Sequence, residues 1–373
     1  MKSVIFLIFI FAGCLFSAME VANAQPSFSG QENLFKTPRH YVACYTNESP
    51  VIDGVITDTE WNNAPWSEYF RNIEGDLKPD PPLRTRMKML WDDAYLYIAA
   101  ELEEPHVWAY LQKRDDIVYY DNDFEIFIDP RNTTHQYFEI EVNAHHTIFD
   151  LFMTKAYRNG GGALISWDTP GLKSAVKVYG TLNDPTDNDQ GWTVEMAIPY
   201  KAVTIGNNPN IPREGSIWRI NFSRVEWNTD IKDGKYIRKI DSSGKLLPEE
   251  NWVWSPQGVI NMHFPERWGY LMFSKQTKLS QTPEFVLPYS EIQRQYLWLI
   301  YYRQKEYLQK NGRYALTFDE LNIKPSVFDI EGQTNTLFME SSGRQFSVDI
   351  ESRESRININ DEGLISTVRR RND

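Results

Sequence analysis

The chain has 373 residues, with 39 lysines and arginines against 51 aspartates and glutamates, and a formal net charge of −12. This acidic balance, without a basic stripe, argues against a nucleic-acid partner, because neutralisation of phosphates dominates that kind of binding. A neutral ligand or a cation fits the charge better. Aromatic residues make up 14% of the chain. Some of these rings are expected to face a ligand with apolar faces, and sugar rings have such faces.

The first 24 residues have the pattern of a secretory signal. Lys2 precedes an apolar run over 4–16, and Ala22-Asn23-Ala24 forms the small-x-small motif after which signal peptidase cuts. The run is too short for a membrane span. We therefore expect an exported protein, periplasmic, secreted or at the cell surface, with no transmembrane segment after removal of the signal. A lipoprotein signal ending at Cys14 is the less favoured alternative, because Phe11 is a poor residue three places before a lipidated cysteine.

The next segments predict a short lead and then a long β domain. Residues 25–40 are polar and lack periodicity, which predicts a flexible lead. Residues 41–275 show short alternating runs separated by loops rich in Gly, Asp, Asn and Pro. The expected strands are 86–91, 95–100, 123–129, 137–143, 174–181, 191–198, 216–226 and 268–274. This pattern predicts a mainly β fold, an antiparallel β-sandwich of two sheets.

Two of these expected strands carry acidic residues on one face. In 137–143 the polar side chains Glu139, Glu141 and Asn143 point away from the apolar face. Glu125, on the preceding strand, could pair with Glu141 as the acid and nucleophile of a glycosidase. Acidic residues are also common on the solvated face of a sheet, so both interpretations stay open.

The C-terminal part, residues 285–373, has a different pattern. Apolar residues recur with a period near 3.6 over 289–312, which predicts a helix that Asn311-Gly312 ends. A short second helix is expected near 318–321, and a small hairpin over 346–350 and 357–359. We interpret this part as a short α-helical and β-hairpin extension of the sandwich. A protein that docks on a surface through this helix is a further alternative.

Two acidic loops predict bound calcium, because oxygen-rich loops suit a hard cation. The first loop contains Asp121 and Asp123. The second contains Asp184, Asp187 and Asp189. Asp and Asn are also frequent in turns for the backbone hydrogen bonds they accept, so a purely structural role stays open.

Segments in a fixed order resemble carbohydrate-binding module family 9 and its stand-alone relatives, over about residues 41–274. The segments are 51–56 (VIDGVI), 60–61 (EW), 90–98 (LWDDAYLYI), 123–129 (DFEIFID), 191–199 (GWTVEMAIP) and 265–271 (PERWGYL). The resemblance implies a two-sheet β-sandwich, bound calcium and recognition of an oligo- or polysaccharide at its chain end. It also implies glycan-degrading enzymes as partners, since relatives are often attached to xylan-degrading catalytic domains.

The resemblance also implies a binding site. In the family two Trp rings clamp the terminal sugar, while Glu, Arg and Asn bind its hydroxyls. The first ring corresponds to Tyr119, with Tyr120 beside it, and the strand Glu corresponds to Glu125. The family's Asn corresponds to Asn143, but the Arg two residues earlier is replaced by Glu141.

The second ring of the clamp is absent from its expected place just before Pro265. The chain has Met262 and His263 there, which makes His263 a further candidate for ligand contact. Trp252 or Trp254 could supply the missing ring, although each fits a core position equally well. The family's clamp is therefore only half present in this sequence.

These observations favour an exported carbohydrate-binding protein that recognises the ends of sugar chains. It would serve polysaccharide capture or carbohydrate catabolism without catalysis of its own. Whether the chain is an enzyme stays open, and a glycoside hydrolase-associated or hydrolytic protein acting on O-glycosyl bonds is the alternative. A haem-binding redox sandwich is the second alternative, with Met87, Met89, Met153 or Met262 as ligand, although a core position suits each of them.

Overall fold

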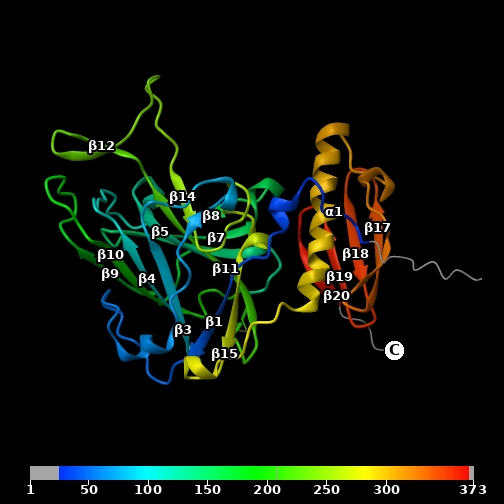
Figure 1. Ribbon diagram of the computed structural model, residues 1–373, viewed down its shortest axis with the longest axis horizontal. Helices are drawn as coiled ribbons and strands as arrows, with labels where there is room; N and C mark the ends of the chain where they lie inside the picture. The colour runs from blue at the N-terminus through cyan, green and yellow to red at the C-terminus, as the bar shows by residue number, and fades with distance from the viewer. Residues whose placement is uncertain (1–24, 208, 369–373) are drawn as a thin grey trace, which may run out of the picture.

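The computed structural model describes residues 25–207 and 209–368, which form a β-sandwich and a smaller C-terminal unit built around one helix (Figure 1). The expected signal and Cys14 lie outside these residues. No helix in the described ranges is long and apolar enough to cross a membrane.

Thirteen strands make up the sheet of the sandwich. Their order is β8 (Ala163–Leu164), β7 (Ile148–Lys155), β6 (His135–Asn143), β5 (Asp123–Asp129), β11 (Ile217–Glu226), β15 (Gly269–Ser274), β1 (His40–Tyr45), β3 (Thr85–Trp91), β4 (Tyr95–Glu103), β10 (Gly191–Pro199) and β9 (Lys173–Tyr179). Off this path, β14 (Glu250–Val253) pairs with β11 and with β2 (Arg71–Asn72). β12 (Thr229–Lys232) and β13 (Lys235–Arg238) form a separate hairpin.

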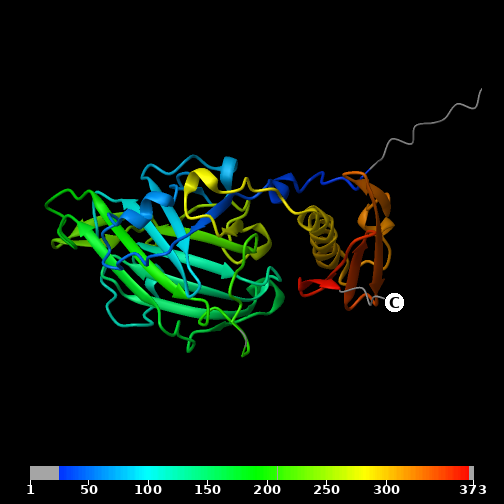
Figure 2. The ribbon, with the colours of Figure 1, turned by 90° about the horizontal axis from the view of Figure 1, so that it is seen from below.

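This sheet curls over on itself, so that its two halves face each other in two layers (Figure 2). Side chains from both halves share one core: Met89 of β3 and Ile98 of β4 belong to the same buried cluster as Ile126 of β5, Ile140 of β6 and Phe222 of β11. The predicted β-sandwich is thus confirmed. It differs from the expectation in one respect, because β1 runs parallel to both of its neighbours, β15 and β3.

Alternation along β5 and β6 decides which side chains can form a site. Ile126 and Ile140 point into the core between the layers, so Glu125, Glu139 and Glu141 must point to the outer face of the same layer. Loops cover this outer face, and all three glutamates are at most 5% exposed. The open alternative of a solvated acidic face therefore does not hold for these residues.

The C-terminal unit consists of α1 and a second sheet. α1 (Tyr289–Asn311) ends at Gly312, which has a φ of 71° and donates its N–H to the carbonyl of Leu308. The five-stranded sheet is antiparallel and follows chain order: β16 (Val327–Ile330), β17 (Gln333–Ser341), β18 (Phe346–Glu351), β19 (Arg356–Asn360) and β20 (Ile365–Val368). The expected hairpin is therefore the β18–β19 part of a larger sheet.

Residues 25–40, expected as a flexible lead, instead pack against α1. Phe28 lies with its ring centroid 5.2 Å from that of Tyr296, and Phe35 packs against Phe28 at 4.5 Å. Tyr296 also donates a hydrogen bond to Gln25, with 2.6 Å between the oxygens. The expectation of a flexible lead was wrong because it rested on the polar composition of the segment, whereas Phe28 and Phe35 fix the segment by their contacts.

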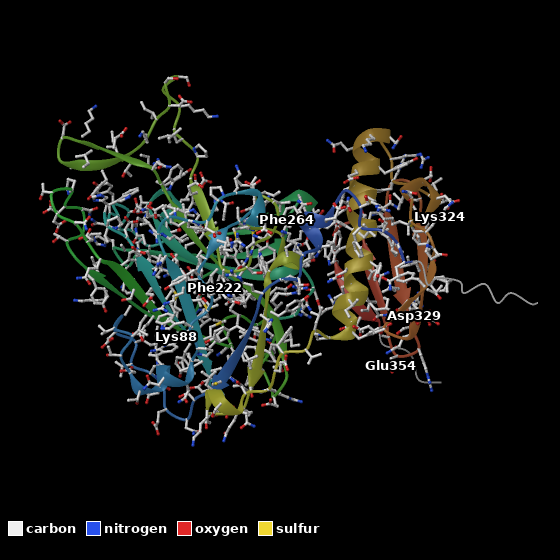
Figure 3. All side chains as sticks on the ribbon, viewed as in Figure 1. Lys88, Phe222, Phe264, Lys324, Asp329 and Glu354 are labelled. Atoms are coloured by element: carbon white, nitrogen blue, oxygen red, sulfur yellow. The ribbon has the colours of Figure 1, made fainter. Side chains whose placement is uncertain are left out.

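Buried ion pairs join the sandwich to α1. Glu291 of α1 accepts hydrogen bonds from Arg219 of β11 at 2.8 Å and from Asn132 at 2.7 Å. Further along α1, Tyr302 donates a hydrogen bond at 2.5 Å to Glu266, which pairs with Arg158 inside the sandwich at 2.7 Å. Phe264, at the junction between the two units in Figure 3, lies under the guanidinium of Arg158 at 3.9 Å. Phe222, by contrast, lies inside the sandwich in the same view.

Candidate functional site

A pocket of about 460 Å³ lies on the outer face of β5, β6 and β7. Glu125, Glu139 and Glu141 of the sheet line it, and loops bring Tyr119 and His263 to it from both sides. Four of the eight predicted ligand residues therefore meet in one pocket, although they come from segments more than a hundred positions apart. Such convergence of polar groups on one concavity is typical of a ligand site.

Apolar side chains surround the mouth of this pocket. Ile117, Ile165 and Ile260 line it and are 43%, 58% and 67% exposed. Tyr157 adds an exposed ring on the same lining. Large apolar side chains left open to water in this arrangement favour a ligand with an apolar surface.

Strand register sets the acidic floor of the pocket. Glu125 lies directly opposite Glu141 across the β5–β6 ladder, and Glu139 lies opposite Phe127. Asp123 precedes Glu125 by two residues and so points to the same face. Asp123, Glu125 and Glu141 each offer a carboxylate oxygen, and these oxygens lie within 4.8 Å of one another.

The surroundings of these carboxylates disfavour their charged forms. Burial raises the pKa of Glu125 to about 7. Burial, together with the neighbouring charge of Glu125, raises the pKa values of Asp123, Glu139 and Glu141 well above the usual range. At neutral pH the cluster therefore carries protons and can both donate and accept hydrogen bonds.

His263 faces the pocket as a neutral ring. Burial, with a contribution from Arg158, lowers the pKa of His263 to about 4. Its Nδ1 lies 2.8 Å from the hydroxyl of Tyr137, and Tyr157 packs edge-on against it at 4.6 Å. A neutral His263 is therefore available as a hydrogen-bonding wall of the pocket.

Asn143 lies beside the pocket but its polar atoms are already used. Its amide donates to the carbonyl of Leu111 and to Asp121, and its side-chain oxygen accepts the N–H groups of His145 and Thr147. This side chain holds the turn after β6, and the structure does not bring it into the lining of the pocket.

The two tryptophans considered for the missing ring belong to the core. Trp252 is 5% exposed and Trp254 is fully buried, and both are members of the cluster between the layers. Gly269 leaves room for Trp254, because a Cβ there would lie 2.3 Å from its ring. The structure thus brings neither ring to the pocket.

Tyr120 lies beside Tyr119, with 4.7 Å between ring centroids, but faces the guanidinium of Arg238 at 5.0 Å rather than the pocket. Tyr119 itself is held by its backbone, whose carbonyl accepts a hydrogen bond from the indole of Trp227 at 2.7 Å. Of the two adjacent rings, only Tyr119 lines the pocket.

The acidic loops proposed for calcium hold the backbone instead. Asp121 accepts the N–H groups of Tyr110 and Leu111. Asp189 accepts those of Val107 and Thr181, and Asp184 caps Thr186. Asp187 is exposed and joins no cluster of metal-ligating side chains among the described residues. The carboxylates of Asp121, Asp184 and Asp189 thus hold backbone N–H groups in this structure, and of the five predicted calcium residues Asp123 alone belongs to a candidate cluster of the described residues.

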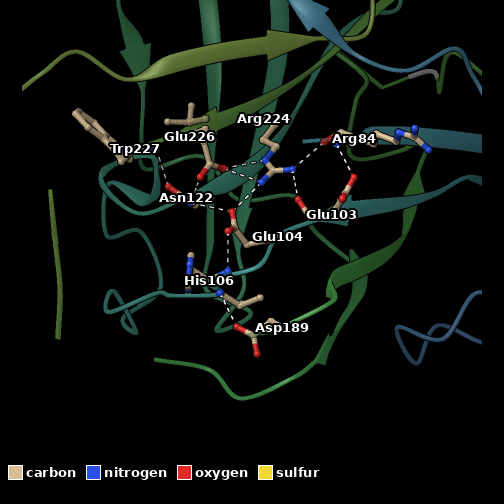
Figure 4. Close-up of polar contacts among 12 residues, drawn as sticks. Arg84, Glu103, Glu104, His106, Asn122, Asp189, Arg224, Glu226 and Trp227 are labelled. Atoms are coloured by element: carbon tan, nitrogen blue, oxygen red, sulfur yellow. Dashed lines mark hydrogen bonds and ion pairs between the residues drawn. The ribbon is translucent and has the colours of Figure 1, made fainter. Parts of the chain in front are cut away.

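A second group of largely buried acidic side chains, Glu104 and Glu226, has a cation beside it. Arg224 donates to both Glu104 and Glu226 at 2.8 Å, and Asn122 donates to Glu226 at 2.7 Å (Figure 4). An internal cation thus compensates these carboxylates. Glu125, Glu139 and Glu141 of the pocket, and Asp123 beside them, have no such cation, since none of the ion pairs between described residues includes them.

The methionines considered as haem ligands do not fit that role. Met87, Met89 and Met153 are fully buried in hydrophobic clusters. Met262 lines the pocket, but its sulfur accepts a hydrogen bond from Gln257 at 3.1 Å. Each sulfur therefore acts as part of the packing.

Several residues that line the pocket were not predicted from the sequence as site residues. Glu139 carried a usable signal, because it shares the face of Glu141 by strand alternation. Tyr157, Asn251 and the isoleucines of the mouth lie on loops or a short strand whose position depends on the tertiary fold. No local pattern distinguishes them.

A family model described as "Carbohydrate family 9 binding domain-like" matches residues 52–245. Among curated proteins, the endo-1,4-beta-xylanase A of Thermoanaerobacterium saccharolyticum is 29% identical over 185 residues, which is 50% of this chain and 14% of the relative. The exoglucanase XynX of Acetivibrio thermocellus is 29% identical over 181 residues, 48% of this chain and 14% of that protein. The matched region is thus a small part of each relative.

Two solved structures of a carbohydrate binding module family 9 from Caldicellulosiruptor kristjanssonii are similar to this chain. The complex with cellotriose has a TM-score of 0.40 and 19% identity, covering 66% of this chain and all of the module. The complex with glucose has a TM-score of 0.40 and 18% identity, covering 67% of this chain and all of the module.

Proposed function

The chain belongs to the carbohydrate family 9 binding domain-like family, and we propose that it is an exported protein that binds the end of a sugar chain in the pocket on β5, β6 and β7. One observation supports this choice of site above all others. Tyr119 and Glu125, which the resemblance implies as ligand residues, line the same pocket as Glu141.

The chemistry of the pocket suits a sugar. Sugar hydroxyls both donate and accept hydrogen bonds, and a floor of partly protonated carboxyl groups offers both functions. The C–H faces of the ring need apolar partners, which Tyr119 and the isoleucines of the mouth supply. Recognition of chain ends is the binding mode that the resemblance to family 9 implies, and it is proposed here on that ground.

The names of the curated relatives guide the choice of first ligands. A xylanase and an exoglucanase support β-1,4-linked xylo- and gluco-oligosaccharides as test compounds. Capture of such chains would place this protein beside glycan-degrading enzymes, as part of polysaccharide catabolism.

Calorimetric titration of the purified protein tests the proposal. Xylo-, cello- and manno-oligosaccharides are compared with derivatives reduced at the chain end, with Glu125→Gln as the site variant. Saturable heat that is lost on reduction of the sugar end, and weakened by the variant, supports end recognition in this pocket. Absence of heat with every sugar contradicts it.

Glycoside hydrolysis is the second candidate function, because Glu125 and Glu141 face each other with carboxylate oxygens within 4.8 Å. Retaining glycosidases hold two carboxyl groups about 5–5.5 Å apart, with different pKa values. Product release in the same titration samples decides between the candidates. A turnover that Glu125→Gln abolishes supports hydrolysis, and stable oligosaccharide with unchanged length supports binding alone.

Export rests on the signal pattern of residues 1–24, which lie outside the described residues. N-terminal sequencing of the protein recovered from the host checks it. A first residue at Gln25 supports cleavage after Ala24, whereas a lipidated start at Cys14 supports a membrane-anchored lipoprotein.

A further inference from the structure

One wall of the pocket consists of Tyr157 and His263, whose rings pack edge-on with 4.6 Å between their centroids. Neither residue lies on a strand. Tyr157 begins the short turn Tyr157–Asn159 that follows β7, and His263 comes just before the turn Pro265–Arg267. The register of the sheet therefore does not fix this wall, and contacts of the two turns must do so.

Arg158, the residue after Tyr157, joins the two segments of the wall. Its guanidinium donates to the carbonyl of His263 at 2.9 Å and to both carboxylate oxygens of Glu266, at 2.7 and 2.9 Å. It also lies over the ring of Phe264 at 3.9 Å. A planar guanidinium can make several such bonds in a fixed geometry. Arg158 therefore ties the backbone of His263 to the segment that carries Tyr157.

The helix α1 contacts both segments through two consecutive residues. Tyr301 donates a hydrogen bond to the side chain of Asn159 at 2.5 Å, and Tyr302 donates one to Glu266 at 2.5 Å. Both tyrosines are buried. Phe264 packs against the hydrophobic core of the C-terminal unit. Each segment of the wall is thus bound to the C-terminal unit as well as to the sandwich.

We propose that the C-terminal unit is part of the sugar pocket, because α1 and Arg158 together hold Tyr157 and His263 where they face the ligand. Arg158 does not line the pocket, so it is a positioning residue. This inference rests on the proposed function, since it gives the wall a role in sugar binding. A wall that is ordered before the ligand arrives avoids the entropy cost of ordering its side chains on binding.

Two variants loosen the wall without changing a residue of the pocket lining. Tyr302→Phe removes the hydroxyl through which α1 binds Glu266. Arg158→Lys keeps the positive charge but loses the planar fork that reaches both Glu266 and the carbonyl of His263. Calorimetry with the best oligosaccharide should show an affinity about 5-fold lower for Tyr302→Phe and about 10-fold lower for Arg158→Lys, because two wall side chains must then be ordered on binding.

Lys155→Met is the matched control. Lys155 pairs with Glu362 of the C-terminal unit at 2.7 Å, so this ion pair also joins the two units. Neither of its residues belongs to the wall segments or lines the pocket. Sugar affinity should therefore change less than about 2-fold in this variant. Circular dichroism verifies that all three variants are folded.

NMR of the histidine rings reports on the wall in the absence of sugar. Burial, with a contribution from Arg158, lowers the pKa of His263 to about 4. Tyr302→Phe leaves Arg158 and its charge in place, so a change in this pKa reports the access of water. A loosened wall should raise the pKa of His263 towards its ordinary value near 6.5. A purely stabilising role of Tyr302 at the junction would leave the pKa unchanged.

The outcomes separate this inference from the proposed function. If the wild-type protein binds sugar, lower affinity together with a raised pKa of His263 in Tyr302→Phe supports the positioning role. Either change without the other overturns it, and so does the absence of both or an equal loss of affinity in Lys155→Met. If the wild-type protein binds no sugar, the proposed function fails. A raised pKa then still supports a wall held by α1, and an unchanged pKa overturns that as well.

Discussion

Glu141 lies directly opposite Glu125 on neighbouring strands, with both side chains at most 5% exposed. In an antiparallel pair, directly opposed side chains approach to about 5 Å, and like charges there destabilise the sheet. The sequence places an acid at a position where the resemblance to family 9 implies an arginine. The sandwich therefore brings together, in the lining of its pocket, two acids that cannot both be charged without destabilising the sheet.

An arginine at this position should act as a built-in cation. Glu141→Arg is expected to raise the free energy of unfolding at neutral pH by about 1–3 kcal/mol, because it replaces a pair of buried acids that cannot both be charged with a charge-assisted hydrogen bond. Urea denaturation of the variant and the wild type measures the effect. A variant that is less stable than the wild type contradicts this prediction.

Tyr119 should contribute to sugar affinity through its ring. Tyr119→Ala is expected to weaken binding by about 1–2 kcal/mol, or roughly 10-fold, because it removes the aromatic wall beside the acidic floor. Tyr69→Ala is the control, since Tyr69 is 43% exposed and lines a different pocket. Calorimetry with the best oligosaccharide measures the difference. Equal losses in the two variants would show that Tyr119 has no special role.

His263 should make stability depend on pH in the mildly acidic range. Its folded pKa is about 4, below the value near 6.5 of an unfolded histidine, so only the unfolded chain gains a proton between these values. The unfolding free energy should therefore fall, by up to about 3 kcal/mol, as pH drops from about 6.5 to 4. His263→Gln lacks this titrating group, so its unfolding free energy should fall less than that of the wild type as pH drops from about 6.5 to 4. Thermal denaturation of both proteins across this range tests it, and parallel curves contradict it.

The ordered motifs of the sequence predicted the fold because they hold one another in place. Glu195 of the 191–199 motif accepts a hydrogen bond from the indole of Trp61 at 2.7 Å and from the N–H of Gly54 at 2.9 Å. Gly54 has a φ of 86°, and a Cβ there would lie 2.8 Å from the backbone of Val176. These motifs are thus structural contacts, which explains why they identify a sandwich without identifying its ligand.

The site was predictable only where it lies on strands. Alternation placed Glu125 and Glu141 on one face, and the register of β5 and β6 then made them neighbours. Trp252 could not be separated from a ligand ring by sequence, because a buried strand and a binding strand have the same apolar pattern. Ile165 and Ile260 come from loops folded over the sheet, and their approach to the pocket depends on contacts distant in sequence.

Glu291 should be the residue that keeps the C-terminal unit attached to the sandwich. It is 4% exposed and pairs with Arg219, itself 5% exposed, across the junction. Neighbouring Arg219, Arg294 and Asn132 hold the pKa of Glu291 below its usual value, although burial opposes them. Its carboxylate is therefore charged at neutral pH, and its loss would leave the guanidinium of Arg219 buried without a counter-ion.

Glu291→Ala is therefore expected to cost about 3–5 kcal/mol of unfolding free energy, the usual result of removing one partner of a buried ion pair. The matched control is Asp319→Ala, which removes an acid paired with Lys324 at the surface of the C-terminal unit and should cost about 1 kcal/mol or less. Urea denaturation compares the two, and limited proteolysis within 275–288 reports detachment of α1. Faster cleavage there in Glu291→Ala, with sugar affinity unchanged, would show that the junction and the pocket are independent. Equal stability of the two variants would mean instead that the apolar contacts of α1 hold the units together without the ion pair.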